Sequence, residues 1–182
     1  MESIFLTGPK HSGKTSAGKA LAFLCSCDFI DLDDLIEQQT GKSPRALYSE
    51  DPLKFKKAEA EALAALEESA CSKQKQRVIA TGGGIIDNPE AVSLLENVKT
   101  VYLSISADTA WDRILRAQDG DVPPFLKTGN PGETHRALHE RRGTAYRQLA
   151  ALVIEAEGKT PEEIAREILD RECNTGDLSS GI

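Results

Sequence analysis

The chain has 182 residues, 40% of them hydrophobic, and its 29 acidic residues against 22 Lys and Arg give a formal net charge of −7. This length lets one domain bury its own core without disulfides or a structural metal. The acidic balance argues against nucleic acids and anionic membrane surfaces as partners, because proteins bind such polyanions through clustered Lys and Arg.

The N-terminal apolar run, Ile4 to Leu6, stops at Gly8 and is too short for a signal peptide or a membrane span. The four cysteines form no C-x-x-C pair and no regular disulfide framework. We therefore expect a cytoplasmic protein, and we expect it to be a monomer.

Short apolar runs and helical periodicities alternate along the chain. Strands are predicted over 3–7, 28–32, 77–80, 98–105 and 151–154. Helices are predicted near 17–24, 35–40, from 51 past 66, from 88, over 108–115 and 133–149, and from 160. This alternation indicates an α/β fold with a parallel sheet covered on both faces, because parallel neighbours need crossover connections.

Residues 118–132 hold three Pro and three Gly, and this composition predicts a loop. We expect one domain over 1–171 and a polar tail over 172–182. In parallel sheets of this kind, ligands bind beyond the carboxyl ends of the strands.

Residues 8–15 read GPKHSGKT and satisfy the phosphate-loop pattern G-x-x-x-x-G-K-[ST] between a strand and a helix. The glycines let backbone N–H groups turn toward phosphate oxygens, and the start of the helix adds its positive dipole end. Lys14 is expected to reach the β- and γ-phosphates, and Thr15 to ligate Mg²⁺. The residues predicted to bind the nucleotide here are Gly8, Ser12, Gly13, Lys14, Thr15 and Ser16.

Two carboxylates, Asp31 and Asp33, follow the second predicted strand. A strand places residues i and i+2 on one face, so Asp31 and Asp33 are predicted to point the same way. At a phosphate site, one carboxylate could stand near Mg²⁺ while the other orients an acceptor hydroxyl and takes its proton. The alternative is that these residues cap the following helix, where Asp34 fits as an N-terminal charge.

Three glycines, Gly82 to Gly84, end the third predicted strand. Ordering three glycines in a row is costly in chain entropy, because glycine loses more conformational freedom on folding than other residues. A close approach of backbone amides to a substrate would explain the triplet. A tight turn between strand and helix is the alternative.

The predicted helix 133–149 carries arginines and two histidines. The arginines could clamp a phosphate or carboxylate beside the 118–132 loop, or form a solvated helix face, and both interpretations stay open. His135 and His139 are four residues apart but lack a third metal ligand, so we expect them on the surface. The arginines are Arg136, Arg141, Arg142 and Arg147.

Together, the phosphate loop, the D-x-D, the glycine triplet, the Pro/Gly-rich loop and the following R-x-x-x-Y resemble the shikimate kinase family. The similarity runs from about Ile4 to Leu169. It implies a five-stranded parallel sheet in the order 2-3-1-4-5. It also implies transfer of the γ-phosphoryl group of MgATP to a hydroxyl of shikimate, with residues of about 118–132 closing as a lid.

The resemblance also implies residue roles. Asp31 would sit near the metal, and Asp33 would hold and deprotonate the acceptor hydroxyl. Gly82 and Gly83 would contact the acceptor, and Arg113 would pack on adenine.

At three further positions the resemblance concerns the acceptor and the lid. Arg142, four residues before Tyr146, would bind the acceptor's carboxylate. Lys56 stands where the family has an arginine for the same carboxylate, and a lysine lacks the planar bidentate fork. Pro123 stands where the family's lid arginine reaches the ATP phosphates.

The leading hypothesis is therefore a small-molecule kinase that phosphorylates shikimate. One alternative is a related kinase acting on another hydroxylated metabolite, motivated by Lys56. The other is an ATP-binding regulatory module with weak transfer, motivated by Pro123.

Overall fold

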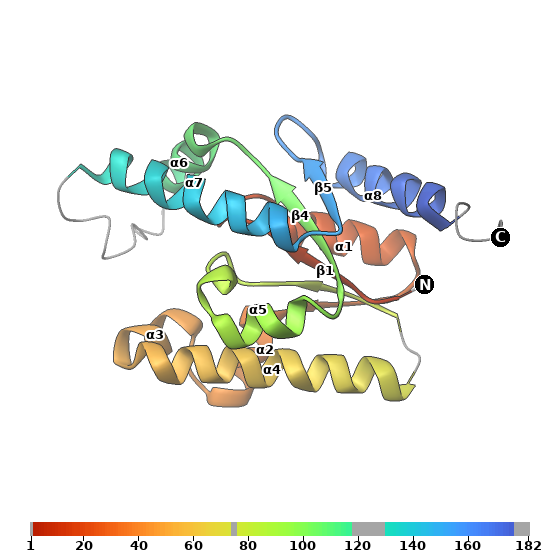
Figure 1. The fold of residues 1–182 in the computed structure, drawn as a ribbon, viewed down its shortest axis with the longest axis horizontal. Coiled ribbons are helices and arrows are strands. Elements are labelled where there is room, and N and C mark those ends of the chain that lie inside the picture. The colour runs from red at the N-terminus through yellow and green to blue at the C-terminus, as the bar shows by residue number, and fades with distance from the viewer. Residues whose placement is uncertain (1, 74–75, 118–129, 177–182) are drawn as a thin grey trace.

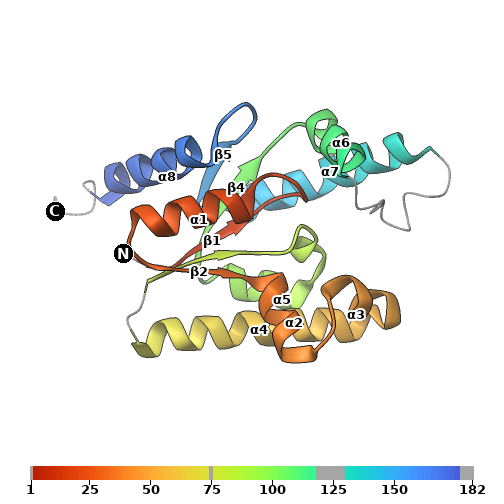
Figure 2. The same ribbon diagram turned by 180° about the vertical axis from the view of Figure 1, so that it is seen from behind.

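The structure is a computed structural model that describes residues 2–73, 76–117 and 130–176 (Figures 1 and 2). The elements in chain order are β1 (Ile4–Thr7), α1 (Lys14–Leu24), β2 (Asp28–Asp31), α2 (Leu32–Thr40), α3 (Pro44–Glu50), α4 (Pro52–Lys73), β3 (Arg77–Ala80), η1 (Ile85–Asp87), α5 (Pro89–Leu95), β4 (Lys99–Ser104), α6 (Ala107–Arg116), α7 (Pro131–Leu149), β5 (Leu152–Glu155) and α8 (Pro161–Gly176). No helix in these ranges is long and apolar enough to cross a membrane.

The five strands form one parallel sheet in the order β2-β3-β1-β4-β5, as the family resemblance implies. Ile4 at the start of the central strand β1 pairs with Val78 of β3 and Lys99 of β4. All strands therefore end at the same edge, which brings the segments after β1, β2 and β3 together.

Alternate residues of each strand feed two cores, one on each face of the sheet. Ile4 and Leu6 of β1 face the core shared with α1, α6 and α8. Phe5, between them, faces the core shared with α2, α4, α5 and α7. Figures 1 and 2 show α1 and α8 on one side of the sheet and α4 and α5 on the other. Both faces are covered, so the central strand β1 and its neighbour β3 are buried over all four of their residues.

The structure differs from the prediction at several element boundaries. The helix α3 was not predicted, although Ser43 followed by Pro44 is a start signal: the Ser43 Oγ accepts a hydrogen bond from the Ala46 N–H at 3.3 Å. The last helix, α8, continues through Gly176 and overlaps the tail predicted from 172. The predicted 118–132 loop lies largely outside the described residues, and its final residues already belong to α7.

Candidate active site

The phosphate loop after β1 turns on residues with positive φ. Gly8 has φ 140° and Gly13 93°, values that glycine adopts without steric cost. His11, between them, also has a positive φ of 63°. A Cβ on Gly8 would also lie 2.6 Å from the Leu103 carbonyl oxygen. The backbone therefore curls tightly above β1 before α1 begins at Lys14.

Two polar side chains inside this loop, Ser12 and Lys14, are buried. Ser12 is 1% exposed, and its buried Oγ has no hydrogen-bond partner. The Lys14 ammonium donates to the carbonyl oxygens of Gly8 (3.0 Å) and Pro9 (2.9 Å). Burial lowers the pKa of Lys14 to about 8, against the opposing effect of Asp33 and Asp31. A bound phosphate would satisfy both side chains, so the loop fits a nucleotide.

Thr15 and Asp31 meet beside the loop. The Thr15 Oγ1 donates to Asp31 Oδ2 at 2.8 Å, and Asp31 Oδ1 accepts from the Asp33 N–H at 3.1 Å. Both side chains offer hard oxygen donors, which suit Mg²⁺ shared with nucleotide phosphates. Over the described ranges, no group of three His, Cys, Asp or Glu side chains could hold a metal by itself.

The strand argument for Asp31 and Asp33 was wrong, although the two do lie together. β2 ends at Asp31, which is the N-cap of α2, and Asp33 and Asp34 occupy the first turn of that helix. Asp31 thus caps a helix and also contacts Thr15. Its capping of the Asp33 N–H, and not strand alternation, brings the carboxylates together.

Asp33 faces the end of β3 across the glycine triplet. A Cβ on Gly82 would lie 3.0 Å from Asp33 Oδ1 and 3.3 Å from Glu59 Oε1. A Cβ on Gly83 would lie 2.7 Å from the backbone nitrogen of Lys10 in the phosphate loop. Burial and the neighbouring Asp31 raise the pKa of Asp33, against the charges of Lys14 and Lys10. The glycines therefore permit close packing of the phosphate loop and the carboxylates.

A cavity of about 560 Å³ opens beside the phosphate loop. It lies between α3 and α4 on one side and α7 on the other, with the glycine triplet and η1 between them. Its charged lining side chains are Lys10, Asp33, Arg45, Lys56, Glu59, Asp87 and Arg142.

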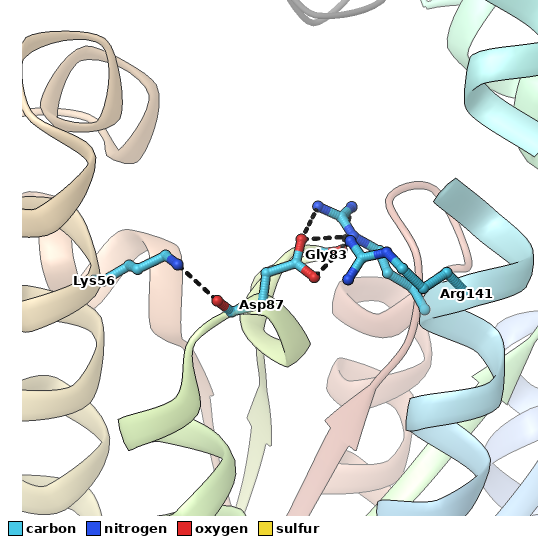
Figure 3. A network of polar contacts seen from close by, with 5 residues as sticks. Lys56, Gly83, Asp87 and Arg141 are labelled. Atoms are coloured by element: carbon cyan, nitrogen blue, oxygen red, sulfur yellow. Dashed lines mark hydrogen bonds and ion pairs between the residues drawn. The ribbon is translucent and has the colours of Figure 1, made fainter. Parts of the chain in front are cut away.

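Lys56 and Arg141 approach Asp87 from opposite sides (Figure 3). Lys56, Asp87 and Arg142 all line the cavity. The Arg142 guanidinium donates to Asp87 Oδ2 through Nε (3.0 Å) and Nη2 (2.6 Å), and to the Gly83 carbonyl through Nη1 (3.3 Å). Arg141 Nη2 donates to Asp87 Oδ1 at 2.9 Å. The Lys56 ammonium donates to the Asp87 main-chain oxygen at 2.7 Å.

The arginines of α7 divide between the two interpretations that the sequence left open. Arg142 lines the cavity. Arg136 pairs with Asp108, and Arg147 with Glu155, in exposed ion pairs. Such surface pairs contribute little to stability.

Arg113 of α6 lies at the phosphate loop, where its Nη1 donates to the His11 carbonyl oxygen at 2.7 Å. The prediction of exposed histidines was wrong: His135 is 8% exposed, and its ring packs against that of Trp111 at a tilt of 39°, with ring centroids 5.1 Å apart. The ring of His139 contacts the Ile105 carbonyl oxygen at 3.0 Å. Packing of α7 against α6 buries His135 and partly covers His139, and both histidines line the cavity. Pro123 lies outside the described residues.

Glu59 and Asp87 are site residues that sequence reasoning missed. Glu59 is 1% exposed, and its Oε2 accepts from Asn88 Nδ2 at 2.9 Å. Burial raises the pKa of Glu59 to about 7; the Asn88 hydrogen bond opposes this shift, while the nearby Asp33 adds to it. Its position in F-K-K-x-E, three residues after Lys56, was a usable signal, whereas nothing local distinguishes Asp87.

We expect the buried Glu59 to destabilise the protein as pH rises. The folded-state pKa of Glu59 is about 7, above its ordinary 4.5. As pH rises from 4.5 to about 7, Glu59 ionises in the unfolded chain before it ionises in the folded one, so the free energy of unfolding falls over this range. Glu59→Gln should raise the free energy of unfolding by about 2–3 kcal/mol near pH 8 and change it little near pH 4. Urea unfolding across this range measures both; an equal difference at the two ends would contradict the assignment.

A phosphate loop, a carboxylate beside it and an adjoining acceptor-sized cavity on this sheet define a P-loop kinase acting on a small molecule. The sequence model described as shikimate kinase matches residues 10–172. The chain therefore belongs to the shikimate kinase family, and it is an ATP-dependent small-molecule kinase.

Individual relatives agree. The shikimate kinase of Marinomonas sp. (strain MWYL1) is 36% identical over 170 residues, which cover 92% of this chain and 90% of the relative. That of Sulfurihydrogenibium sp. (strain YO3AOP1) is 34% identical, with 94% and 98% covered. The solved shikimate kinase from Acinetobacter baumannii in complex with shikimate has a TM-score of 0.82 at 30% identity, covering 96% of this chain and 94% of that one. A gluconokinase from Sinorhizobium meliloti 1021, with a TM-score of 0.54 at 18% identity, shares the fold alone.

Proposed function

We propose that this enzyme transfers the γ-phosphoryl group of MgATP to a hydroxyl of shikimate, giving shikimate 3-phosphate and ADP for aromatic amino acid biosynthesis. The observation that carries the proposal is the composition of the cavity beside the phosphate loop. Asp33 lines it near the loop, and two cations suited to a carboxylate, Lys56 and Arg142, line it around Asp87. Shikimate carries both groups that this arrangement requires, hydroxyls and one carboxylate.

The reaction forms a bond between the acceptor oxygen and the γ-phosphorus and breaks the bond from that phosphorus to the β,γ-bridging oxygen. Asp33 orients the acceptor hydroxyl and takes its proton, helped by its raised pKa. Lys14 and the loop amides stabilise the charge on the transferring group. Thr15 and Asp31 would hold Mg²⁺, which when bound neutralises charge on the phosphates. Arg113, beside His11, would pack on adenine.

An ADP-release assay across shikimate, gluconate, homoserine and nucleosides tests the acceptor. We expect turnover with shikimate to exceed that with nucleosides by at least about 100-fold in kcat/KM, because nucleosides bring no carboxylate to the two cations. Shikimate should also be preferred over gluconate and homoserine, because these acids are flexible chains that lose more conformational entropy on binding than the shikimate ring does. Preferred turnover of a different compound would favour the alternative acceptor that Lys56 suggests. Tight ATP binding without stimulation by any acceptor would favour a regulatory module.

We expect Lys56→Arg to improve the use of shikimate. A guanidinium can bind a carboxylate through two parallel hydrogen bonds, whereas the Lys56 ammonium acts as a point charge. The KM for shikimate should fall about three- to tenfold, with kcat and the KM for ATP nearly unchanged. Lys57→Arg on the same helix, with a more exposed side chain, is the matched control. An unchanged KM in the Lys56 variant would point to a different acceptor.

We further propose that the enzyme acts as a cytoplasmic monomer. Cys25, Cys27 and Cys173 are free thiols in the described part of the chain, which agrees with a reducing compartment. Sedimentation equilibrium would give the mass of one chain, 19.7 kDa; a dimer mass would contradict this.

A further inference from the structure

One residue of η1, Asp87, holds both cations that the proposed function assigns to the acceptor's carboxylate. One oxygen of its carboxylate pairs with Arg142 and the other with Arg141, and its main-chain oxygen accepts a hydrogen bond from the Lys56 ammonium (Figure 3). Before any acceptor binds, the cation pair of the cavity thus has an internal carboxylate as its partner.

The hydrogen bonds of Arg142 show how much of its guanidinium is engaged. The group has five N–H donors, of which Nε and one donor of Nη2 point to Asp87 and one donor of Nη1 to Gly83. Two donors remain, one on each terminal nitrogen. An acceptor carboxylate would therefore share this guanidinium with Asp87, or displace it.

The charge of Asp87 persists at neutral pH. Burial would raise its pKa, but the hydrogen bonds and charges of Arg142 and Arg141 outweigh burial and hold the pKa below its ordinary value. The side chains of Asp87 and Arg142 are 26% and 22% exposed, so water screens their field only in part. A second carboxylate on Arg142 would meet a fixed negative charge at close range.

We propose that Asp87 is a specificity-determining residue that competes with the acceptor's carboxylate for Arg142 and thereby weakens the binding of acidic acceptors. This inference rests on the proposed function, in which Arg142 and Lys56 bind that carboxylate. Arg141 is already hydrogen-bonded to Asp87. It keeps the Asp87 carboxylate bound when an acceptor displaces that carboxylate from Arg142.

The test is Asp87→Asn, which keeps the shape of the side chain and removes its charge. The KM for shikimate should fall about five- to tenfold, with kcat and the KM for ATP changed less than about twofold. Shikimamide, the neutral carboxamide of shikimate, should gain nothing from the substitution, because it brings no charge to be repelled. Glu90→Gln, an exposed acid three residues further on, is the matched control and should change neither KM.

Titration calorimetry with shikimate separates this inference from the proposed function, because it measures acceptor affinity without turnover. Tighter binding to the Asn variant supports competition by Asp87 even if the wild-type protein phosphorylates another compound. Unchanged or weaker binding overturns it and makes Asp87 a residue that positions Arg142. Asp87→Ser, which adds no amide donors toward the arginines, should repeat the gain; a gain in the Asn variant alone would come from the new amide and would also overturn the inference.

Discussion

Asp33→Asn is expected to lower kcat by at least about 100-fold while the dissociation constant for ATP stays within about threefold. The substitution removes the only proposed proton acceptor for the acceptor hydroxyl, but it leaves Lys14 and the loop amides in place. The amide keeps the helix position of Asp33 and its backbone bond to Asp31. ADP release gives kcat, and calorimetry gives the ATP affinity.

The neighbouring Asp34 supplies the control for this substitution. Asp34 lies in the same first turn of α2, but its side chain is exposed. Asp34→Asn should therefore keep kcat within about twofold, since the exposed Asp34 carboxylate lies in water, whose high dielectric constant weakens its field at the site. Preserved turnover in Asp33→Asn together with lost ATP binding would reverse the roles assigned here.

Lys14→Met is expected to lower kcat/KM for ATP by about 1,000-fold or more. The ammonium of Lys14 is buried within the loop and bonds only to the carbonyl oxygens of Gly8 and Pro9 in the contacts described, so it is poised to move onto phosphate oxygens. Methionine retains the apolar stem and removes the charge. Lys19→Met on the exposed side of α1 is the control and should be nearly neutral.

The pH dependence of ATP binding tests the role of Lys14 independently. The pKa of Lys14 is about 8 in the free protein, and bound phosphates stabilise the ammonium and raise this pKa. Affinity is therefore full below about pH 8 and falls as pH rises above it. Lys14→Met should lose this dependence along with the affinity. A Lys14→Met protein that binds and turns over ATP normally would refute the assignment of the loop.

The nucleotide half of the proposed site can be recognised in the sequence more directly than the acceptor half. Gly8 to Thr15 is one contiguous segment, and its required context, a strand before and a helix after, is local as well. Asp31 and Asp33 lie beside this loop for a different reason than the predicted strand alternation, since β2 ends one residue earlier than predicted and α2 begins directly after it at Leu32.

The acceptor half is assembled from elements far apart in the chain. Lys56, Asp87 and Arg142 come from α4, η1 and α7, and the contacts between them span 31 and 55 residues. No spacing rule links such positions. The burial of Glu59 and His135 has the same origin, because a polar residue on a helix becomes buried only when another element packs over it.

By itself, the sequence determined the class of fold, the phosphate loop and the parallel sheet, because strand and helix periodicity and glycine placement act over a few residues. The order 2-3-1-4-5 came from resemblance and agrees with the structure. Only the tertiary structure decided which charges meet: it joined the cations expected for the acceptor to the carboxylate and main-chain oxygen of Asp87. The reason is that charge pairing in a cavity depends on distances of a few ångströms between elements, which the fold sets.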